Sequence, residues 1–180
     1  INLTLRTLFV VIPILLLTKL SGNDMASIYL KRGNLRLGLV IGLVTFLIFL
    51  VTSIPAAMYL FGGNSANMTT PNLISWAPWI LAFVIVNGLR EELWFRGLFL
   101  RKYEPLLGVD PSNLLQALIF SLAHLVPTFT LLQIIVFLTI FFFLGLGFGE
   151  VMRKTDSALG SILFHAGTDI PVIIAAFSIL

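Results

Sequence analysis

Two adjacent glutamates, Glu91 and Glu92, interrupt an otherwise apolar part of the chain. They follow directly on the run PWILAFVIV, within the charged stretch NGLREELWFRGLFLRKY at residues 87–103. The residues beyond them, LWFRGLFL, are again mostly apolar, which argues against a solvated loop. Charge inside an apolar segment is costly unless it is paired, and an unpaired carboxylate is a candidate general base for activating water. The stretch therefore indicates either a structural ion pair or a catalytic group.

The spacing of the charges assigns different tasks to the two glutamates. Neighbours on a helix point about 100° apart, so Glu91 and Glu92 cannot do the same job. Glu92 and Arg96 stand at i and i+4 with the acid first, which is the favourable order for an ion pair. Glu91 has no basic residue at i+3 or i+4, where Trp94 and Phe95 stand instead. We therefore predict that Arg96 holds Glu92 and that Glu91 is unpaired.

The only two histidines of the chain also fall in apolar runs. His124 shares a helical face with Phe120 and Ser121. His165 is followed at i+4 by Asp169, whose carboxylate could fix the tautomer and orientation of the ring. A lone histidine in a membrane helix more often bonds to a neighbouring helix, and a lone Glu–Arg pair is usually structural. Glu91, His124 and His165, taken together and at similar depths in the apolar segments, indicate a catalytic site.

The elements that must position these residues are expected to be membrane helices. Hydrophobic residues make up 58% of the 180 and charged residues only 11%, and the mean hydropathy is +1.05. A soluble domain usually carries about a quarter charged residues, so the composition predicts an integral membrane protein. The expected fold class is all-α, a polytopic transmembrane helix bundle of about six spans. The absence of cysteine excludes thiolate sites, and a net charge of +3 does not indicate nucleic acid.

Six apolar segments are candidates for these spans. They are expected at residues 3–18 and 37–61, from Pro71 into the charged stretch, from Ser112, from Thr130, and from Ser157 to the end. The first has no small-residue cleavage pattern after it, so it is expected to be a span rather than a signal peptide. Pro171 is expected to bend the last span. The small residues of GLGFG in the fifth span are expected to form a close-packing face.

The placement of basic residues predicts the orientation. Lys19, Lys31, Arg32 and Arg36 follow the first span, Arg101 and Lys102 the third, and Arg153 and Lys154 the fifth. The alternate loops, GGNSANMTTPN and VPTFT, contain neither Lys nor Arg. Such a bias places the basic side in the cytoplasm, here of a prokaryotic plasma membrane. Counted from that side at about 1.5 Å per helical residue, Glu91, His124 and His165 lie roughly 15, 18 and 12 Å deep, which predicts one site open to the cytoplasm.

At these positions the sequence resembles the CPBP intramembrane proteases, which comprise CAAX prenyl-protease type and bacteriocin-processing or self-immunity (Abi) proteins. The family pattern is EExxxR, FxxxH, and HxxxN or HxxxD on successive membrane helices. The chain carries EELWFR from Glu91, FSLAH ending at His124, and HAGTD from His165, in that order. The expected division is into N-terminal spans without a family signature, residues 1–70, and a catalytic membrane core, residues 71–180.

The resemblance implies an intramembrane endopeptidase in which Glu91 activates the attacking water and His124 and His165 complete the site. The supporting residues would be Glu92, Arg96, Phe120 and Asp169. The implied partners are the lipid bilayer and a peptide or lipidated protein substrate. The prenyl-protease branch removes a C-terminal tripeptide after a lipidated cysteine, and other members process bacteriocin or leader peptides. A non-catalytic bacteriocin self-immunity protein that acts by binding is the alternative.

Two chemistries remain open for the same three residues. Glu91, His124 and His165 could supply three ligands to a zinc ion and leave a fourth position for water. They could also act without a metal, with the carboxylate as base and the histidines donating to the oxyanion. The sequence favours the metal-free form. If Glu91 were a ligand and Glu92 were held by Arg96, no second carboxylate would remain as the base.

Overall fold

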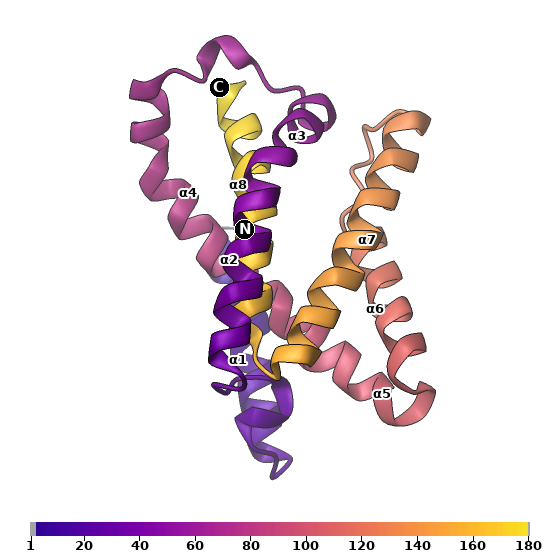
Figure 1. Ribbon diagram of the computed structural model, residues 1–180. Coiled ribbons are helices and arrows are strands. Elements are labelled where there is room, and N and C mark those ends of the chain that lie inside the picture. The colour runs from indigo at the N-terminus through magenta and orange to yellow at the C-terminus, as the bar shows by residue number, and fades with distance from the viewer. Residues whose placement is uncertain (1–2, 180) are drawn as a thin grey trace.

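The computed structural model describes residues 3–179, and this part of the chain is helical with no strand (Figure 1). The all-α fold class is therefore confirmed. In chain order the elements are α1 (Leu3–Leu20), η1 (Met25–Ile28), α2 (Leu35–Thr52), α3 (Ile54–Phe61), η2 (Ser65–Asn67), α4 (Thr70–Glu91), η3 (Glu92–Leu100), α5 (Arg101–Leu107), α6 (Val109–Ala123), α7 (Leu131–Thr155) and α8 (Ala158–Ser178). Two of them, η1 and η2, are short 3-10 helices, whereas η3 is a π-helix.

Four helical segments are long and apolar enough to cross a membrane. They are Leu35–Thr52, Thr70–Leu107, Leu131–Thr155 and Ala158–Ser178. The apolar part of α1 is shorter, and the 15 residues of α6 extend only about 22 Å, against a hydrocarbon core of about 30 Å. Many large apolar side chains on α1, α2, α4 and α7 are exposed, as expected for faces that contact lipid. The chain is an integral, multi-pass membrane protein.

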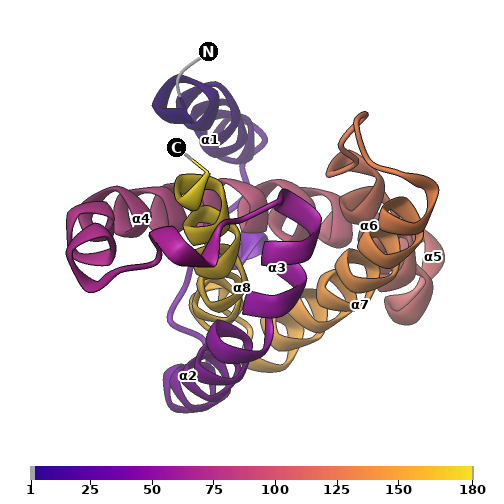
Figure 2. The ribbon, with the colours of Figure 1, turned by 90° about the horizontal axis from the view of Figure 1, so that it is seen from above.

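Helix α8 is the central element of the bundle. In Figure 2 it is surrounded by α2, α3, α4 and α7, while α1 lies outside and α6 pairs with α7. Half of the apolar window of α8 is buried, against 11% for α2 and 22% for α7. The side chains of α8 therefore face protein from several directions, which suits a helix that carries polar groups.

Small residues allow α2 to lie close against α8. A side chain at Gly42 would meet Leu163 and the carbonyl oxygen of Gly160, both at about van der Waals contact or closer. A side chain at Gly167 would meet the backbone of Phe46 at 2.6 Å, which is too short for any real contact. Without a hydrophobic driving force between helices in lipid, such close approach is a main source of helix association. The packing fixes α8, and with it His165, against the rest of the bundle.

The single span predicted at 37–61 is wrong, because the chain breaks there into α2 and α3. Helix α2 ends at Thr52, and Pro55, in the first turn of α3, has no N–H to continue the hydrogen-bond ladder. Figure 1 shows α3 turned aside at the top of the bundle, next to α8. Leu60 and Phe61 of this short helix line a pocket that His165 and Asp169 also line. Pro171, by contrast, lies inside α8 without interrupting it.

The fourth predicted span is displaced toward the N-terminus. Helix α6 runs over Val109–Ala123 and has His124 as its C-terminal cap, whereas the span was expected to begin at Ser112 and to include His124. Pro127 lies in the irregular segment that follows, and Figure 1 shows α7 rising well past the end of α6. His124 therefore lies at a helix end inside the bundle and not along a continuous span.

The loops that carry Lys and Arg meet at one end of the bundle. The N–H of Asn34 donates to the Thr155 carbonyl at 2.7 Å, and the N–H of Ala158 donates to the Tyr29 carbonyl at 3.0 Å. Asp156 caps α7 in the left-handed conformation, with φ 52°, and its carboxylate pairs with Lys31. These contacts join the α1–α2 connection to the α7–α8 turn.

Candidate active site

The two glutamates lie at a change of helix type. Helix α4 ends at Glu91, and residues Glu92–Leu100 continue without a break as a π-helix. π-Helical turns are rare and occur frequently at functional sites. The wider turn begins between the two carboxylates, and it sends their side chains to different neighbours. No sequence pattern predicted this segment.

Glu92 is held in an inner cluster that we define as Glu92, Arg96, Ser161 and His165. The guanidinium of Arg96 donates to Glu92 Oε1 at 3.0 Å, and both side chains are fully buried. His165 Nδ1 donates to the same oxygen at 2.8 Å, and Ser161 Oγ donates to Oε2 at 2.5 Å. The structure thus contains the predicted Glu92–Arg96 pair, with two further donors from α8. Together they tie η3 to α8.

Arg96 also connects this cluster to α7 and to aromatic rings. Its guanidinium donates to the Gly145 carbonyl at 3.3 Å. The guanidinium carbon lies 4.4 Å from the ring centre of Phe120 and 5.0 Å from that of Phe148. Phe148 in turn stacks on His165 with ring centres 4.7 Å apart. Phe120, expected as a supporting residue, therefore packs against the cation of the inner cluster.

Glu91 belongs to an outer cluster, which we define as Arg90, Glu91 and His124. Glu91 Oε2 lies 3.1 Å from His124 Nε2 and 3.6 Å from His165 Nε2. The other oxygen, Oε1, accepts from the guanidinium of Arg90 at 2.6 Å. The prediction that Glu91 is unpaired is wrong. It considered only positions one turn ahead, whereas a long arginine side chain at i−1 can fold back onto the carboxylate.

The end of α6 explains the position of His124. Its backbone N–H donates to the carbonyl of Ser121, three residues earlier, at 3.2 Å, instead of to the carbonyl four residues earlier as in an α-helix. The carbonyl of Phe120, which would accept that N–H in a longer helix, accepts from His124 Nδ1 at 2.7 Å instead. The helix end therefore fixes the ring and directs Nε2 at Glu91.

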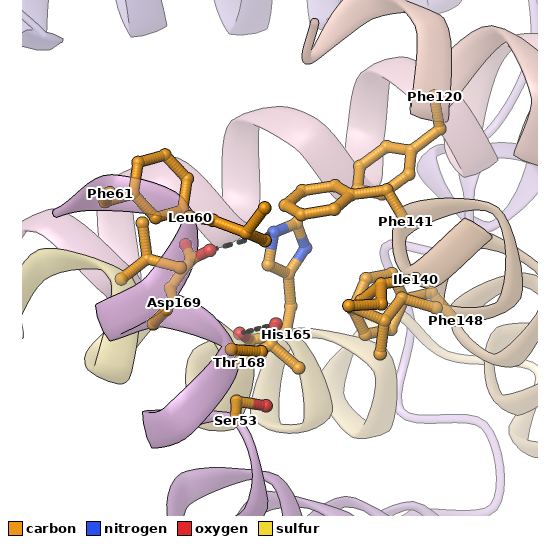
Figure 3. A pocket seen from close by; sticks show the side chains of 14 residues that line it. Ser53, Leu60, Phe61, Phe120, Ile140, Phe141, Phe148, His165, Thr168 and Asp169 are labelled. Atoms are coloured by element: carbon orange, nitrogen blue, oxygen red, sulfur yellow. Dashed lines mark hydrogen bonds and ion pairs between the residues drawn. The ribbon is translucent and has the colours of Figure 1, made fainter. Parts of the chain in front are cut away.

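Asp169 lies beside His165 and contacts its ring at Nε2. Its Oδ1 is 3.5 Å from His165 Nε2, while the close contact on Nδ1 comes from Glu92. The other oxygen of Asp169 accepts from the side-chain amide of Asn87 at 3.0 Å. Glu92 thus orients the ring, and Asp169 lies on the side that faces the site, as Figure 3 shows.

The hydrogen-bond partners constrain the protons on both histidines. A carbonyl only accepts, so His124 Nδ1 carries a proton. Nδ1 of His165 faces a carboxylate oxygen that also pairs with Arg96, so it carries a proton as well. Nε2 of each ring is left to face Glu91. A neutral ring offers a lone pair there, and a protonated ring offers a donor.

Two recesses reach these residues. One is mainly apolar and ends on His165 and Asp169 (Figure 3). Its walls include Leu60 and Phe61 of α3 together with Ile140, Phe141 and Leu144 of α7. The other recess opens beside Glu91 and His124, and its remaining lining is Val10, Arg90, Trp94, Phe95 and Ala123. The outer cluster therefore has open space beside it.

The side chains do not form a ready metal centre. Within residues 3–179, no group of three or more His, Cys, Asp and Glu side chains is arranged to hold a metal ion. The donors that a zinc site would use, Glu91, His124 and His165, contact one another directly instead. The chemistry that these side chains can carry out themselves is water activation by the carboxylate and donation by the rings.

The glycines of α7 act as the expected close-packing face. A side chain at Gly145 would meet Ala117 of α6 at 3.0 Å, and one at Gly147 would meet the ring of Phe164 of α8 at 3.1 Å. The Gly145 carbonyl accepts from Gln116 at 2.8 Å as well as from Arg96. The fit holds α6, α7 and α8 close enough for their side chains to meet.

Sequence reasoning did not assign Arg90, Ser161 or Phe148 to the site. For Ser161 a signal existed, because it stands one turn before His165 on the same face of α8. The stacking of Phe148 on His165 has no counterpart in the sequence. All three expected catalytic residues, from α4, α6 and α8, are brought together.

A membrane bundle whose interior brings a carboxylate and two histidines together has the parts of an intramembrane hydrolase. The family model described as Type II CAAX prenyl endopeptidase Rce1-like matches residues 73–171, more than half of the chain. The chain belongs to this family of intramembrane endopeptidases, and the CPBP resemblance is confirmed. No curated protein sequence and no solved structure matches this chain.

Proposed function

We propose that the protein hydrolyses a peptide bond inside the membrane, with Glu91 activating the attacking water and His124 and His165 completing the site. The observation that carries this proposal is the meeting of Glu91 Oε2 with Nε2 of both rings, at 3.1 and 3.6 Å. The three side chains come from different helices, and they lie beside a recess. A purely structural pair would need only one of the two histidines.

In the proposed reaction, water reaches Glu91 through the recess beside His124. The carboxylate takes one proton from the water, and the hydroxide oxygen bonds to the carbonyl carbon of the substrate. The protonated Nε2 atoms of His124 and His165 donate to the oxyanion that develops. The C–N bond then breaks, and the proton held by Glu91 passes to the leaving nitrogen. The products are a carboxylic acid and an amine, and Glu91 is regenerated.

The supporting residues position these groups. Glu92 holds His165 through Nδ1, and Arg96 holds Glu92, so the ring that donates to the oxyanion cannot rotate. Arg90 holds the second oxygen of Glu91, which leaves Oε2 to face the water. Such positioning lowers the cost of reorganisation in the reaction.

The recess between α3 and α7 suggests an apolar substrate. Its apolar walls favour an apolar group next to the scissile bond, and the proposed substrate is a peptide or lipidated protein. We assign residues 71–180 as the catalytic core and residues 1–70 as supporting spans. Because the basic loops gather at one end of the bundle, we place that end in the cytoplasm of a prokaryotic plasma membrane, with the site open to that side.

The test is cleavage of a membrane-tethered reporter by the purified protein in liposomes. The reporter carries its cleavable segment at the cytoplasmic end of its own membrane helix. Glu91→Gln keeps the shape of the side chain but removes the base, so activity should fall at least about 100-fold. The matched control is Glu150→Gln, which makes the same change at a surface ion pair with Arg153 and Lys154.

Wild-type turnover by Glu91→Gln would overturn the assignment of the base. If neither the wild type nor the control cleaves any reporter while both still bind it, the protein acts by binding, as a self-immunity protein would. The two results differ, because the reporter is cleaved in the first and is only bound in the second.

A further inference from the structure

A second cavity lies away from the candidate active site, at the basic end of the bundle. It lies between the end of α1 on one side and η3 with α5 on the other, and η1 borders it. None of the proposed catalytic residues lines it. Its lining changes in character along its length, from Ile14 and Leu98 at one end to Ser21 and Lys102 at the other.

The polar end of this cavity is positively charged. Arg101 is fixed there, with Nε donating to the Ser27 carbonyl at 3.2 Å and a second nitrogen paired with Glu104 at 3.2 Å. Glu104 also faces Arg153, at 3.7 Å, so one acid lies between two arginines. Lys102 is exposed, and it makes no hydrogen bond or ion pair within the part of the chain that the structure describes. The rim therefore carries a surplus of positive charge and an exposed ammonium group.

The other end of the cavity offers an apolar wall. Ile14, Ile28 and Leu93 form a buried cluster there, and Leu98 packs against it. Leu17, one turn before Ser21, is 62% exposed beside the opening. Along α1 the lining runs from apolar at Ile14 to polar at Ser21, about 10 Å further on, and Arg101 and Lys102 of α5 supply the positive charge. A ligand that fits must have an apolar part and an anionic part.

The position of the cavity matches the surface of a bilayer. It lies where the apolar run of α1 ends, next to Lys19, at the end of the bundle that gathers the basic loops. Basic pockets between membrane helices at this level bind the headgroups of anionic lipids. We propose that the cavity binds one anionic phospholipid, with its phosphate at Arg101 and Lys102 and an acyl chain along Leu17 and Leu98.

This binding would have a structural consequence. Gly97 and Leu98, which line the cavity, belong to the π-helix that begins at Glu92. A lipid in the cavity joins α1 and η1 to this segment, and so stabilises the element that carries Glu92 and Arg96. Thermal stability should therefore rise with anionic lipid, whether or not the protein cleaves peptides.

Native mass spectrometry of the purified, delipidated protein tests the proposal. The probes are phosphatidylglycerol, phosphatidylcholine with the same chains, and glycerol phosphate as the headgroup without a tail. We expect one phosphatidylglycerol retained per protein, about fivefold weaker binding for each basic side chain removed, and no retention of the other two probes. Lys102→Gln removes one charge, and Ser21→Trp fills the polar end. Lys154→Gln removes a lysine at the same end but outside the cavity, and should bind as the wild type does.

Three results would overturn the proposal. Equal retention of phosphatidylcholine would show that charge does not select the ligand. Binding of glycerol phosphate as tight as that of the lipid would make this a site for a soluble phosphate ester. Unchanged binding by Lys102→Gln would remove the cavity as the location, and because that side chain is exposed and unbonded, the variant tests this even if Ser21→Trp does not fold.

Discussion

The inner cluster around Glu92 and the outer cluster around Glu91 are adjacent in sequence but have opposite surroundings. The side chains of Glu92 and Arg96 are fully buried, whereas those of Arg90 and His124 are 18% and 25% exposed. Both oxygens of Glu92 accept hydrogen bonds. Oε1 accepts from Arg96 and His165, and Oε2 accepts from Ser161. Glu91, by contrast, lines a recess together with Arg90 and His124.

The difference shows how one short segment can both hold a bundle together and perform chemistry. A buried ion pair stabilises only when its remaining lone pairs and protons are satisfied, and the inner cluster meets that condition for Glu92. A catalytic carboxylate needs room for water and substrate, and the outer cluster has it. His165 connects the inner cluster to the outer one, because its Nδ1 faces Glu92 and its Nε2 faces Glu91. Three variants or treatments can break or sharpen this distinction.

The largest expected effect separates the two histidines. His124→Ala and His165→Ala should each lower the rate of reporter cleavage by about two to four orders of magnitude, as loss of an acid–base or oxyanion group does. Only His165→Ala should also lower the thermal midpoint in detergent, because its ring is bonded to Glu92 in the buried cluster. An equal loss of stability in both variants would mean that the two clusters are not distinct.

A smaller effect should follow from opening the inner cluster. Arg96→Met leaves Glu92 buried without its cation, and should lower stability by about 3–5 kcal/mol. The double variant Glu92→Gln with Arg96→Met should recover part of that loss, although His165 and Ser161 then lose a charged partner. Chemical or thermal unfolding of the wild type, the double variant and the single variants Glu92→Gln and Arg96→Met gives the coupling between the two residues. A double variant that is no more stable than Arg96→Met would contradict the pairing.

The smallest expected effect is that of metal removal. If Glu91 is the base and the rings donate to the oxyanion, treatment with a chelator followed by gel filtration should leave the cleavage rate unchanged. The measurement is cleavage before and after treatment, with and without added zinc. Loss of activity that zinc restores would instead make Glu91, His124 and His165 ligands, each ring using the neutral Nε2 lone pair.

Much of the site was predictable because it depends on local spacing. The i, i+4 positions of Glu92 and Arg96 imply an ion pair on any helical turn, and the pair is formed. The all-α class follows from apolar runs too long for a soluble core. The three motifs, counted from one side of the membrane, placed Glu91, His124 and His165 at similar depth, and the structure brings them into contact.

The rest of the site depends on contacts between helices, and the spacing of residues along the chain does not predict those contacts. Glu92 and His165 are 73 residues apart, and they meet only because the glycines of α2 and α7 let α8 pack closely on its neighbours. The π-helix after Glu91 and the early end of α6 at His124 turn side chains by amounts that an ideal helix does not predict.

By itself, the sequence determined which residues carry charge inside the membrane, since residue type and helical period are local properties. The tertiary structure decided the partners that come from other helices. It brought His165 to Glu92 and His124 to Glu91, across 73 and 33 residues of chain. The physical reason is that a polar group bonds to whichever donor or acceptor lies near it in space. Between helices, packing decides which groups lie near one another, and distance along the chain does not.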